Sequence, residues 1–180
     1  MERVIKSTVI GEWKSKFYPF DCWESIPIEI PFLNNQAMRI SLRASNPDEA
    51  AKLAAETDPI LNAFLEKTIL DRNALSALVY GHCTNIFEIT GFDHECITMF
   101  KQVQNPESWI LNAIALEELL DLAHINDVWK FVRANGIYIS RGKEGEIYLQ
   151  ISFKCDWDEE HGLDLVFKDG IEFVGMDSLI

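Results

Sequence analysis

The chain has 180 residues, of which 48% are hydrophobic and 11% aromatic, and its formal net charge is −13. This length allows roughly 70% of the unfolded surface to be buried without a disulfide or metal, and the composition excludes disordered and fibrous proteins. The acidic charge excludes a binder of nucleic acids or of anionic membranes, because both partners would repel it.

The first 45 residues predict β-strands. Apolar alternation predicts strands over residues 4–10 and 13–20, which Gly11 separates. The chain then turns at Asn34-Asn35 and enters another alternating stretch over residues 38–43.

Residues 23–32 alternate in the same way and contain Pro27 and Pro31. Both prolines lack a backbone N–H, and their even spacing removes donors from one side of the strand. We therefore expect this strand to lie at the edge of a sheet.

The middle of the chain, residues 46–135, switches to helical periodicity. Asn46 is followed by Pro47 and Glu49, an arrangement typical of the N-cap, the first position and the third position of a helix. Further helix starts are predicted at Thr57-Asp58-Pro59, Asn105-Pro106-Glu107 and Asn126-Asp127, and helix ends before Gly91 and at Asn135-Gly136.

The tail returns to a period of two residues. Strands are predicted over residues 137–140, 146–154, 163–168 and 171–174, with a hairpin turn at Asp169-Gly170. The order of strands, helices and strands predicts an α+β fold: a mostly antiparallel sheet built from N- and C-terminal strands, with central helices packed on one face. We expect a single domain over residues 1–180, made of strands (1–45), a helical middle (46–135) and a C-terminal β-meander (136–180).

The most distinctive segment lies between two predicted strands of this acidic tail, where residues 141–180 carry a net charge of −6. The segment contains four carboxylates, a tryptophan and a histidine at consecutive positions. These are the candidate binding residues: Asp156, Trp157, Asp158, Glu159, Glu160 and His161.

The same segment allows two other interpretations. Paired carboxylates can serve as acid and base, and His with Asp or Glu can hold a divalent cation, so a metal-dependent hydrolase-like enzyme is the alternative function. The spacing matches no motif of known mechanism, however, and we predict no catalytic residue, metal ligand or cofactor. In the other interpretation the segment is a purely structural turn. Asp158 would then cap the turn, the Trp157 side chain would pack into the core, and the chain would leave the turn at His161-Gly162 with a positive φ.

The four cysteines, Cys22, Cys83, Cys96 and Cys155, are far apart and form no CxxC pair. The N-terminal residues contain no continuous apolar run typical of a secretory signal, and no stretch approaches the ~18 apolar residues of a membrane span. We therefore expect a cytoplasmic protein with reduced thiols. Cys155 beside Asp156 and near His161 suggests a thiol nucleophile, but no nucleophile elbow or oxyanion loop surrounds it.

The tail resembles the C-terminal end of an uncharacterised bacterial family of small proteins. The resemblance rests on a W-D-E-E-H-G, then D-G, then V-G signature, present here as residues 157–162, 169–170 and 174–175. More weakly, residues 23–32 resemble the family's tryptophan-containing strand, and residues 128–139 resemble its passage from helix to strand. Some members resemble toxin-immunity proteins, which implies an intracellular protein that binds and blocks a toxin. The resemblance implies no catalytic residue.

We therefore expect a non-enzymatic, cytoplasmic protein-binding protein of the immunity or adaptor type. Its partner would be a basic protein such as a toxin, because complementary charge accelerates association. Neither nucleic acid nor membrane is an expected partner. A structural component that associates with itself through exposed tryptophans is a third interpretation, and the oligomeric state stays open.

Overall fold

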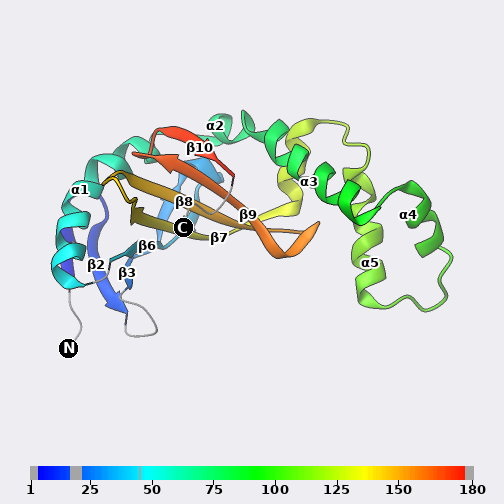
Figure 1. Cartoon of the computed structure of the whole chain (residues 1–180), viewed down its shortest axis with the longest axis horizontal. Helices are drawn as coiled ribbons and strands as arrows, with labels where there is room; N and C mark the ends of the chain where they lie inside the picture. The colour runs from blue at the N-terminus through cyan, green and yellow to red at the C-terminus, as the bar shows by residue number, and fades with distance from the viewer. Residues whose placement is uncertain (1–3, 17–21, 45, 177–180) are drawn as a thin grey trace. The chain divides into compact units, whose positions relative to one another are not determined.

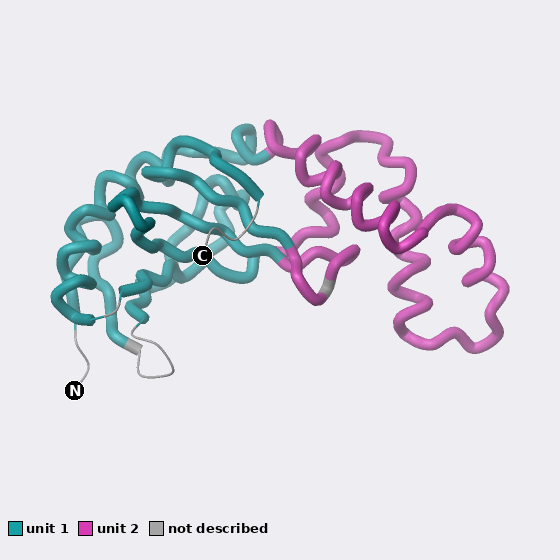
Figure 2. Tube along the Cα trace, in the orientation of Figure 1, with its two compact units in different colours: residues 1–72, 134–153, 163–180 teal, residues 73–133, 154–162 magenta. Residues whose placement is uncertain are grey.

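The computed structural model describes residues 4–16, 22–44 and 46–176, with the side chains of Lys16 and Glu159 excepted. The chain divides into two compact units (Figure 2). Unit 1 comprises residues 1–72, 134–153 and 163–180, and unit 2 comprises residues 73–133 and 154–162. The single domain expected over residues 1–180 stays a prediction.

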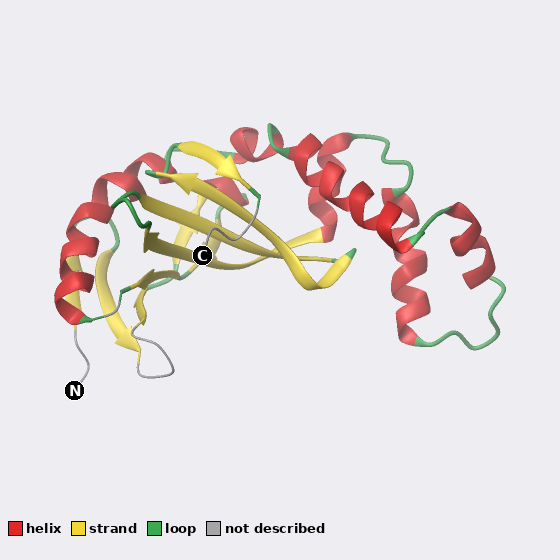
Figure 3. Cartoon of the chain, in the orientation of Figure 1, coloured by secondary structure: helices red, strands yellow, loops and turns green. Residues whose placement is uncertain are grey.

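The fold is α+β, as predicted, with strands from both ends of the chain in one mostly antiparallel sheet (Figures 1 and 3). A separate two-stranded sheet pairs β4 (Ile28–Ile30) with β5 (Gln36–Met38). The eight strands that the structure describes in the main sheet are, in spatial order, β1 (Val4–Ser7), β2 (Gly11–Lys16), β3 (Cys22–Ser25), β6 (Ile40–Arg43), β7 (Val132–Arg141), β8 (Ile147–Cys155), β9 (Asp158–Lys168) and β10 (Glu172–Gly175).

Strands β6 and β7 join the N-terminal half of the sheet to the C-terminal half, and they are parallel. Ile40 lies opposite Ile137 and Leu42 opposite Ile139, and all four side chains are fully buried. Parallel neighbours cannot be joined by a hairpin, so the chain must cross over between them. The crossover, residues 44–131, contains every α-helix that the described residues form.

The helices of this crossover vary in length from five to 19 residues. Among the helices that the described residues form, none combines the length and the apolar character needed to cross a membrane. The described residues form the α-helices α1 (Pro47–Leu65), α2 (Ile69–Asn73), α3 (Ser76–Thr90), α4 (His94–Phe100) and α5 (Ser108–Ala115), and the 3₁₀-helices η1 (Pro31–Leu33), η2 (Leu116–Leu119) and η3 (Ile125–Phe131).

Helix α1 packs against β1 and β6 and closes the core of unit 1. Its Phe64 ring lies 5.8 Å from that of Phe32 and 5.7 Å from that of Phe167, measured between centroids, and all three side chains are buried. The predicted start of α1 is confirmed, because Asn46 accepts a hydrogen bond from the backbone N–H of Glu49 at 2.9 Å. Helices α3, α4 and α5 belong to unit 2.

The predicted second helix start at Thr57-Asp58-Pro59 is wrong, because α1 continues through Pro59. The hydroxyl of Thr57 donates to the carbonyl of Leu53 within the helix, and the Asp58 carboxylate accepts from outside it. Burial of the following turn, with Phe64 fully buried, outweighs the one backbone donor that proline lacks.

The single edge strand predicted over residues 23–32 is also wrong. The chain forms β3, breaks at Pro27, and resumes as β4 in the small sheet, while β3 lies inside the main sheet between β2 and β6. At the break, the backbone N–H of Ile40 donates to the Ser25 hydroxyl at 2.9 Å. A side chain thus replaces the backbone acceptor where the strand ends.

Three features of the crossover differ from the predicted pattern. Helix α4, capped by the Asp93 carboxylate, was not predicted, and α5 begins at Ser108 after a left-handed turn at Asn105. The helix expected to end at Asn135-Gly136 ends instead at Phe131, where β7 begins. A Cβ at Gly136 would lie 2.8 Å from the ring of Tyr138, two residues along the same strand, so this glycine makes room for a neighbour rather than ending a helix.

The hairpin turn predicted at Asp169-Gly170 is confirmed between β9 and β10, with φ values of 50° and 71°. A Cβ at Gly170 would lie 2.4 Å from the Ile60 carbonyl oxygen of α1. Glycine is therefore required here both for the left-handed conformation and for the close approach of the helix.

Phe64→Ala should lower the free energy of unfolding by about 3–5 kcal/mol, because it leaves a cavity between two other buried rings. Leu70→Ala is the matched control, since Leu70 is 75% exposed and its truncation should change stability by about 0.5 kcal/mol or less. Urea denaturation of both variants measures the difference. Equal stabilities of the two variants would contradict this description of the core.

The Asp58 carboxylate accepts hydrogen bonds from the Ser7 hydroxyl, the Thr8 hydroxyl and the Thr8 backbone N–H, at 2.5 to 2.7 Å. Burial disfavours its charge, but these donors outweigh burial and lower the pKa of Asp58. A pKa that is lower in the folded than in the unfolded chain stabilises the fold above the unfolded pKa, and this contribution is lost as the pH falls through the folded pKa.

Asp58→Ala should therefore be destabilised at pH 7 by about 1–3 kcal/mol, since it leaves the Ser7 and Thr8 donors without their acceptor. The difference in free energy of unfolding between Asp58→Ala and the natural protein should decrease as the pH falls below the ordinary pKa range of aspartate. Thr8→Ala removes only one donor and should show a smaller difference. Denaturation measured across pH tests this, and a difference that widens in acid would rule out the assigned sign.

Candidate functional site

Of the candidate binding residues, Asp156 and Trp157 connect β8 to β9, and residues 158–161 form the beginning of β9. We call residues 156–161 the acidic turn, and all of them belong to unit 2. The turn is tight, since β8 ends at Cys155 and β9 begins at Asp158. Gly162 follows with φ of 69°, which is the positive-φ exit expected of a structural turn.

Asp156 is held by the segment around the start of β7. Its backbone N–H donates to the carbonyl of Phe131 at 3.0 Å, and its carboxylate forms an ion pair with Arg133. The side chain of Asp156 is 29% exposed. Its charge is therefore already neutralised within unit 2.

Trp157 packs into unit 2 and is only 7% exposed. Its indole N–H donates to Nδ1 of His82 on α3 at 3.1 Å, and the two ring centroids lie 6.2 Å apart. Because Nδ1 accepts this hydrogen bond, it carries no proton, and the His82 ring is fixed in the tautomer protonated at Nε2. The hydrogen bond links the acidic turn to α3.

Asp158 caps the turn from within. Its Oδ1 accepts from the backbone N–H of His161 at 3.0 Å and lies 3.2 Å from the Nδ1 of the same histidine. The Asp158 side chain is 11% exposed, whereas that of His161 is 82% exposed. Glu160 is exposed, and the side chain of Glu159 lies outside the described part of the structure.

These contacts distribute the carboxylates of the acidic turn over separate partners instead of directing them into one cleft. Among the side chains that the structure describes, no three His, Cys, Asp or Glu gather in a way that could hold a metal ion. The geometry therefore gives no support to the metal-dependent hydrolase. Sequence reasoning missed Arg133 and His82 as partners of the turn, because both are distant from it along the chain.

Two of the four free cysteines are buried in unit 2. Burial raises the pKa of Cys83 and of Cys155 to about 12. At neutral pH both are therefore thiols, whereas nucleophilic attack requires the thiolate. Cys155 does not meet the requirement for the thiol nucleophile considered from the sequence.

The net charge is concentrated in unit 2. This smaller unit includes 12 of the 29 acidic residues of the chain but only four of its 16 basic residues, for a charge of −8. The larger unit 1 includes the other 17 acidic and 12 basic residues, for a charge of −5. All four histidines also belong to unit 2. Part of the acidic charge of the middle and part of that of the tail are thus brought together in unit 2.

Unit 2 also exposes large apolar side chains that the sequence analysis did not single out. Four of them, Met99, Val103, Trp109 and Leu111, lie close together along the chain, and each is 41–56% exposed. The helical spacing of apolar residues gave no signal for this, because an apolar stripe normally predicts burial. The figures place this part of unit 2 at the opposite end of the unit from the acidic turn (Figures 1 and 2).

A family model described as "Domain of unknown function (DUF6985)" matches residues 9–178. The chain belongs to the DUF6985 family. The match confirms that the chain is a member of an uncharacterised family and extends over nearly its whole length. No curated protein and no solved structure matches the chain.

An open depression in unit 1 of this DUF6985 chain provides no better site. Its lining consists of Ala63, Glu66, Lys67, Asp71 and Ile171. These residues include no serine, threonine, cysteine or histidine, and Asp71 is already engaged as the acceptor for the backbone N–H of Thr68 at 2.7 Å. Unit 2 therefore provides the stronger candidate surface.

Thiol labelling tests the buried state of unit 2 in this DUF6985 chain. At pH 7–8 an aromatic disulfide reagent should modify Cys22 and Cys96, which are partly exposed, and should leave Cys83 and Cys155 unmodified until denaturant is added. Mass spectrometry of the labelled peptides identifies the sites. Rapid labelling of Cys155 in the native protein would show a reactive thiol and contradict the assignment.

Proposed function

We propose that this chain is a non-enzymatic, cytoplasmic bacterial protein that binds a basic protein partner, as immunity and adaptor proteins do. The observation that carries the proposal is the charge of −8 on unit 2, where 12 acidic residues stand against four basic ones. A surface of one sign attracts a partner of the opposite sign and accelerates association.

The acidic turn contributes to this surface in two ways. Glu160 and His161 are exposed and available for contact. Asp156, Trp157 and Asp158 fix the turn, through Arg133, His82 and the backbone of His161 respectively. A turn that is held before binding loses little conformational entropy when the partner arrives.

The resemblance of residues 157–162 to the W-D-E-E-H-G signature supports a toxin as the partner. Some members of the family that has this signature resemble toxin-immunity proteins, which bind and block a toxin inside the cell. Many toxins that cleave or bind nucleic acids carry basic surfaces, for the electrostatic reason that makes an acidic inhibitor effective.

The purified chain should bind a basic product of a gene adjacent to its own, and the affinity should fall at least tenfold between about 50 and 500 mM NaCl, because salt screens the attraction between charged surfaces. Calorimetry at the two salt concentrations measures this. Co-expression with a toxic neighbour should also protect cells. Absence of binding to every neighbouring product, or an affinity indifferent to salt, would refute the proposal.

A further inference from the structure

Exposed apolar side chains are concentrated in one part of unit 2, which we call the α4–α5 lobe (residues 93–121). Among its described side chains, unit 2 exposes seven large apolar ones, and four of these lie in the short stretch from Met99 to Leu111. Trp109 is 55% exposed although its indole ring packs edge-on against Phe100, at 5.6 Å between centroids. Apolar side chains that are gathered in this way, rather than scattered singly, are typical of interaction surfaces.

The same lobe is strongly acidic. It contains six acidic residues and a single lysine, for a net charge of −5. The ammonium of Lys101 is held between both carboxylate oxygens of Glu117, at 2.7 and 2.6 Å. The acidic residues are Asp93, Glu95, Glu107, Glu117, Glu118 and Asp121, and all except Glu117 are exposed.

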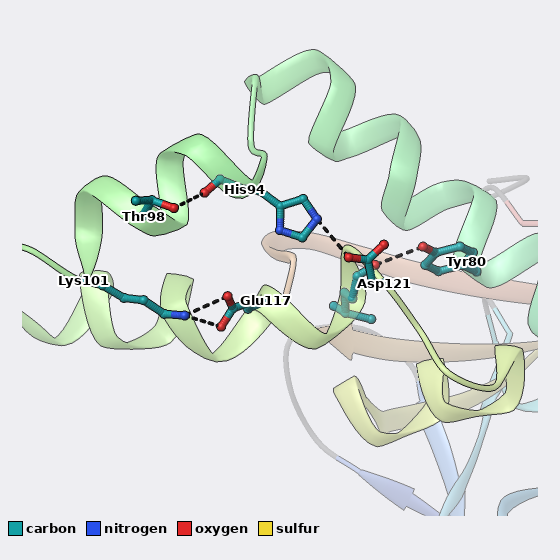
Figure 4. A network of polar contacts seen from close by, with 7 residues as sticks. Tyr80, His94, Thr98, Lys101, Glu117 and Asp121 are labelled. Atoms are coloured by element: carbon teal, nitrogen blue, oxygen red, sulfur yellow. Dashed lines mark hydrogen bonds and ion pairs between the residues drawn. The ribbon is translucent and has the colours of Figure 1, made fainter.

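A network of polar contacts holds the lobe in shape (Figure 4). Lys101 joins the end of α4 to Glu117 of η2, and Nε2 of His94 at the start of α4 lies 3.0 Å from Asp121 (Figure 4). The hydroxyl of Tyr80 on α3 donates to the carbonyl of Leu119 at 3.0 Å and ties η2 to α3. The apolar side chains are thus presented by elements already fixed relative to one another, which lowers the entropic cost of binding.

We propose that the α4–α5 lobe is the docking surface for a basic amphipathic helix of the protein partner. This inference rests on the proposed function and specifies where the partner binds. The apolar side of such a helix would cover Met99 and Trp109, and its lysines and arginines would meet the surrounding carboxylates. Tryptophan supplies the large anchoring contact typical of binding hot spots, and methionine adapts to the shape of the partner.

Charge decides between this occupant and a second copy of the chain. Two copies meeting through the lobe would bring −5 against −5, and neither lobe supplies a lysine or arginine other than Lys101, which is already paired. Like charges held against each other destabilise an interface, whereas a basic helix neutralises the same carboxylates.

The test uses the full chain and a fluorescein-labelled synthetic peptide of about 18 residues, with leucine at positions i, i+3, i+4 and i+7 and lysine elsewhere. Fluorescence anisotropy gives the affinity. Trp109→Ala should weaken binding at least about tenfold, and Met99→Ser should weaken it about three- to tenfold. Because Trp109 also packs on Phe100, Met99→Ser keeps the test decisive if Trp109→Ala unfolds.

The matched controls are Leu70→Ser and Ile171→Ser, which remove side chains of unit 1 that are 75% and 63% exposed. Both should bind the peptide as the natural chain does. A peptide with glutamate in place of lysine should not bind. Equal weakening by lobe and control variants, or no binding of the lysine peptide at all, would overturn the assignment of the lobe.

Analytical ultracentrifugation of the chain alone tests whether the lobe mediates self-association. A dimer that Trp109→Ala dissociates would assign the lobe to self-association and overturn the inference. The proposed function is tested separately. If a neighbouring gene product binds in a salt-dependent way but the lobe variants do not weaken this binding, the basic partner is supported and only the docking surface is rejected.

Discussion

The parallel pairing of β6 with β7 is the constraint on which the rest of the fold depends. Ile40 and Leu42 lie opposite Ile137 and Ile139, and these four buried residues join the two halves of the sheet. A parallel pair demands a long connection, and residues 44–131 supply it. The first helix of that connection, α1, places the buried side chain of Phe64 in the core of unit 1. The later helices, from α3 onward, belong to unit 2. The order of strands, helices and strands along the chain follows from this one pairing.

Within unit 2, the acidic turn is linked to α3 and to the start of β7. Three of its residues form three different contacts: an ion pair with Arg133, an indole hydrogen bond to His82, and a cap on the backbone of His161. Each contact satisfies a buried or charged group locally, so Asp156 and Asp158 act as structural elements of the turn. The acidic side chains that remain for a partner include those of the α4–α5 lobe, whose net charge is −5.

Local signals predicted much of the fold. Asn46 with Pro47, Gly91 and Asp169-Gly170 act within a few residues, and the cap, the helix end and the hairpin are found where they indicate. The helix start predicted at Pro59 was wrong because the burial of α1 outweighs one missing hydrogen bond. The helix end predicted at Asn135-Gly136 was wrong because Gly136 lies in a strand, where it makes room for Tyr138. The partners of the acidic turn were beyond prediction. Arg133 precedes Asp156 by 23 residues and His82 precedes Trp157 by 75, and no local pattern encodes such pairs.

We propose that unit 2 binds a basic partner through the α4–α5 lobe while Asp156, Trp157 and Asp158 of the acidic turn maintain its fold. The indole N–H signals of the five tryptophans in a ¹H–¹⁵N spectrum test this claim most directly, with the lysine–leucine peptide as titrant. On binding, the indole signal of Trp109 should shift, and that of Trp157, whose N–H is hydrogen-bonded to His82, should stay in place. A shift of Trp157 with an unchanged Trp109 would contradict it.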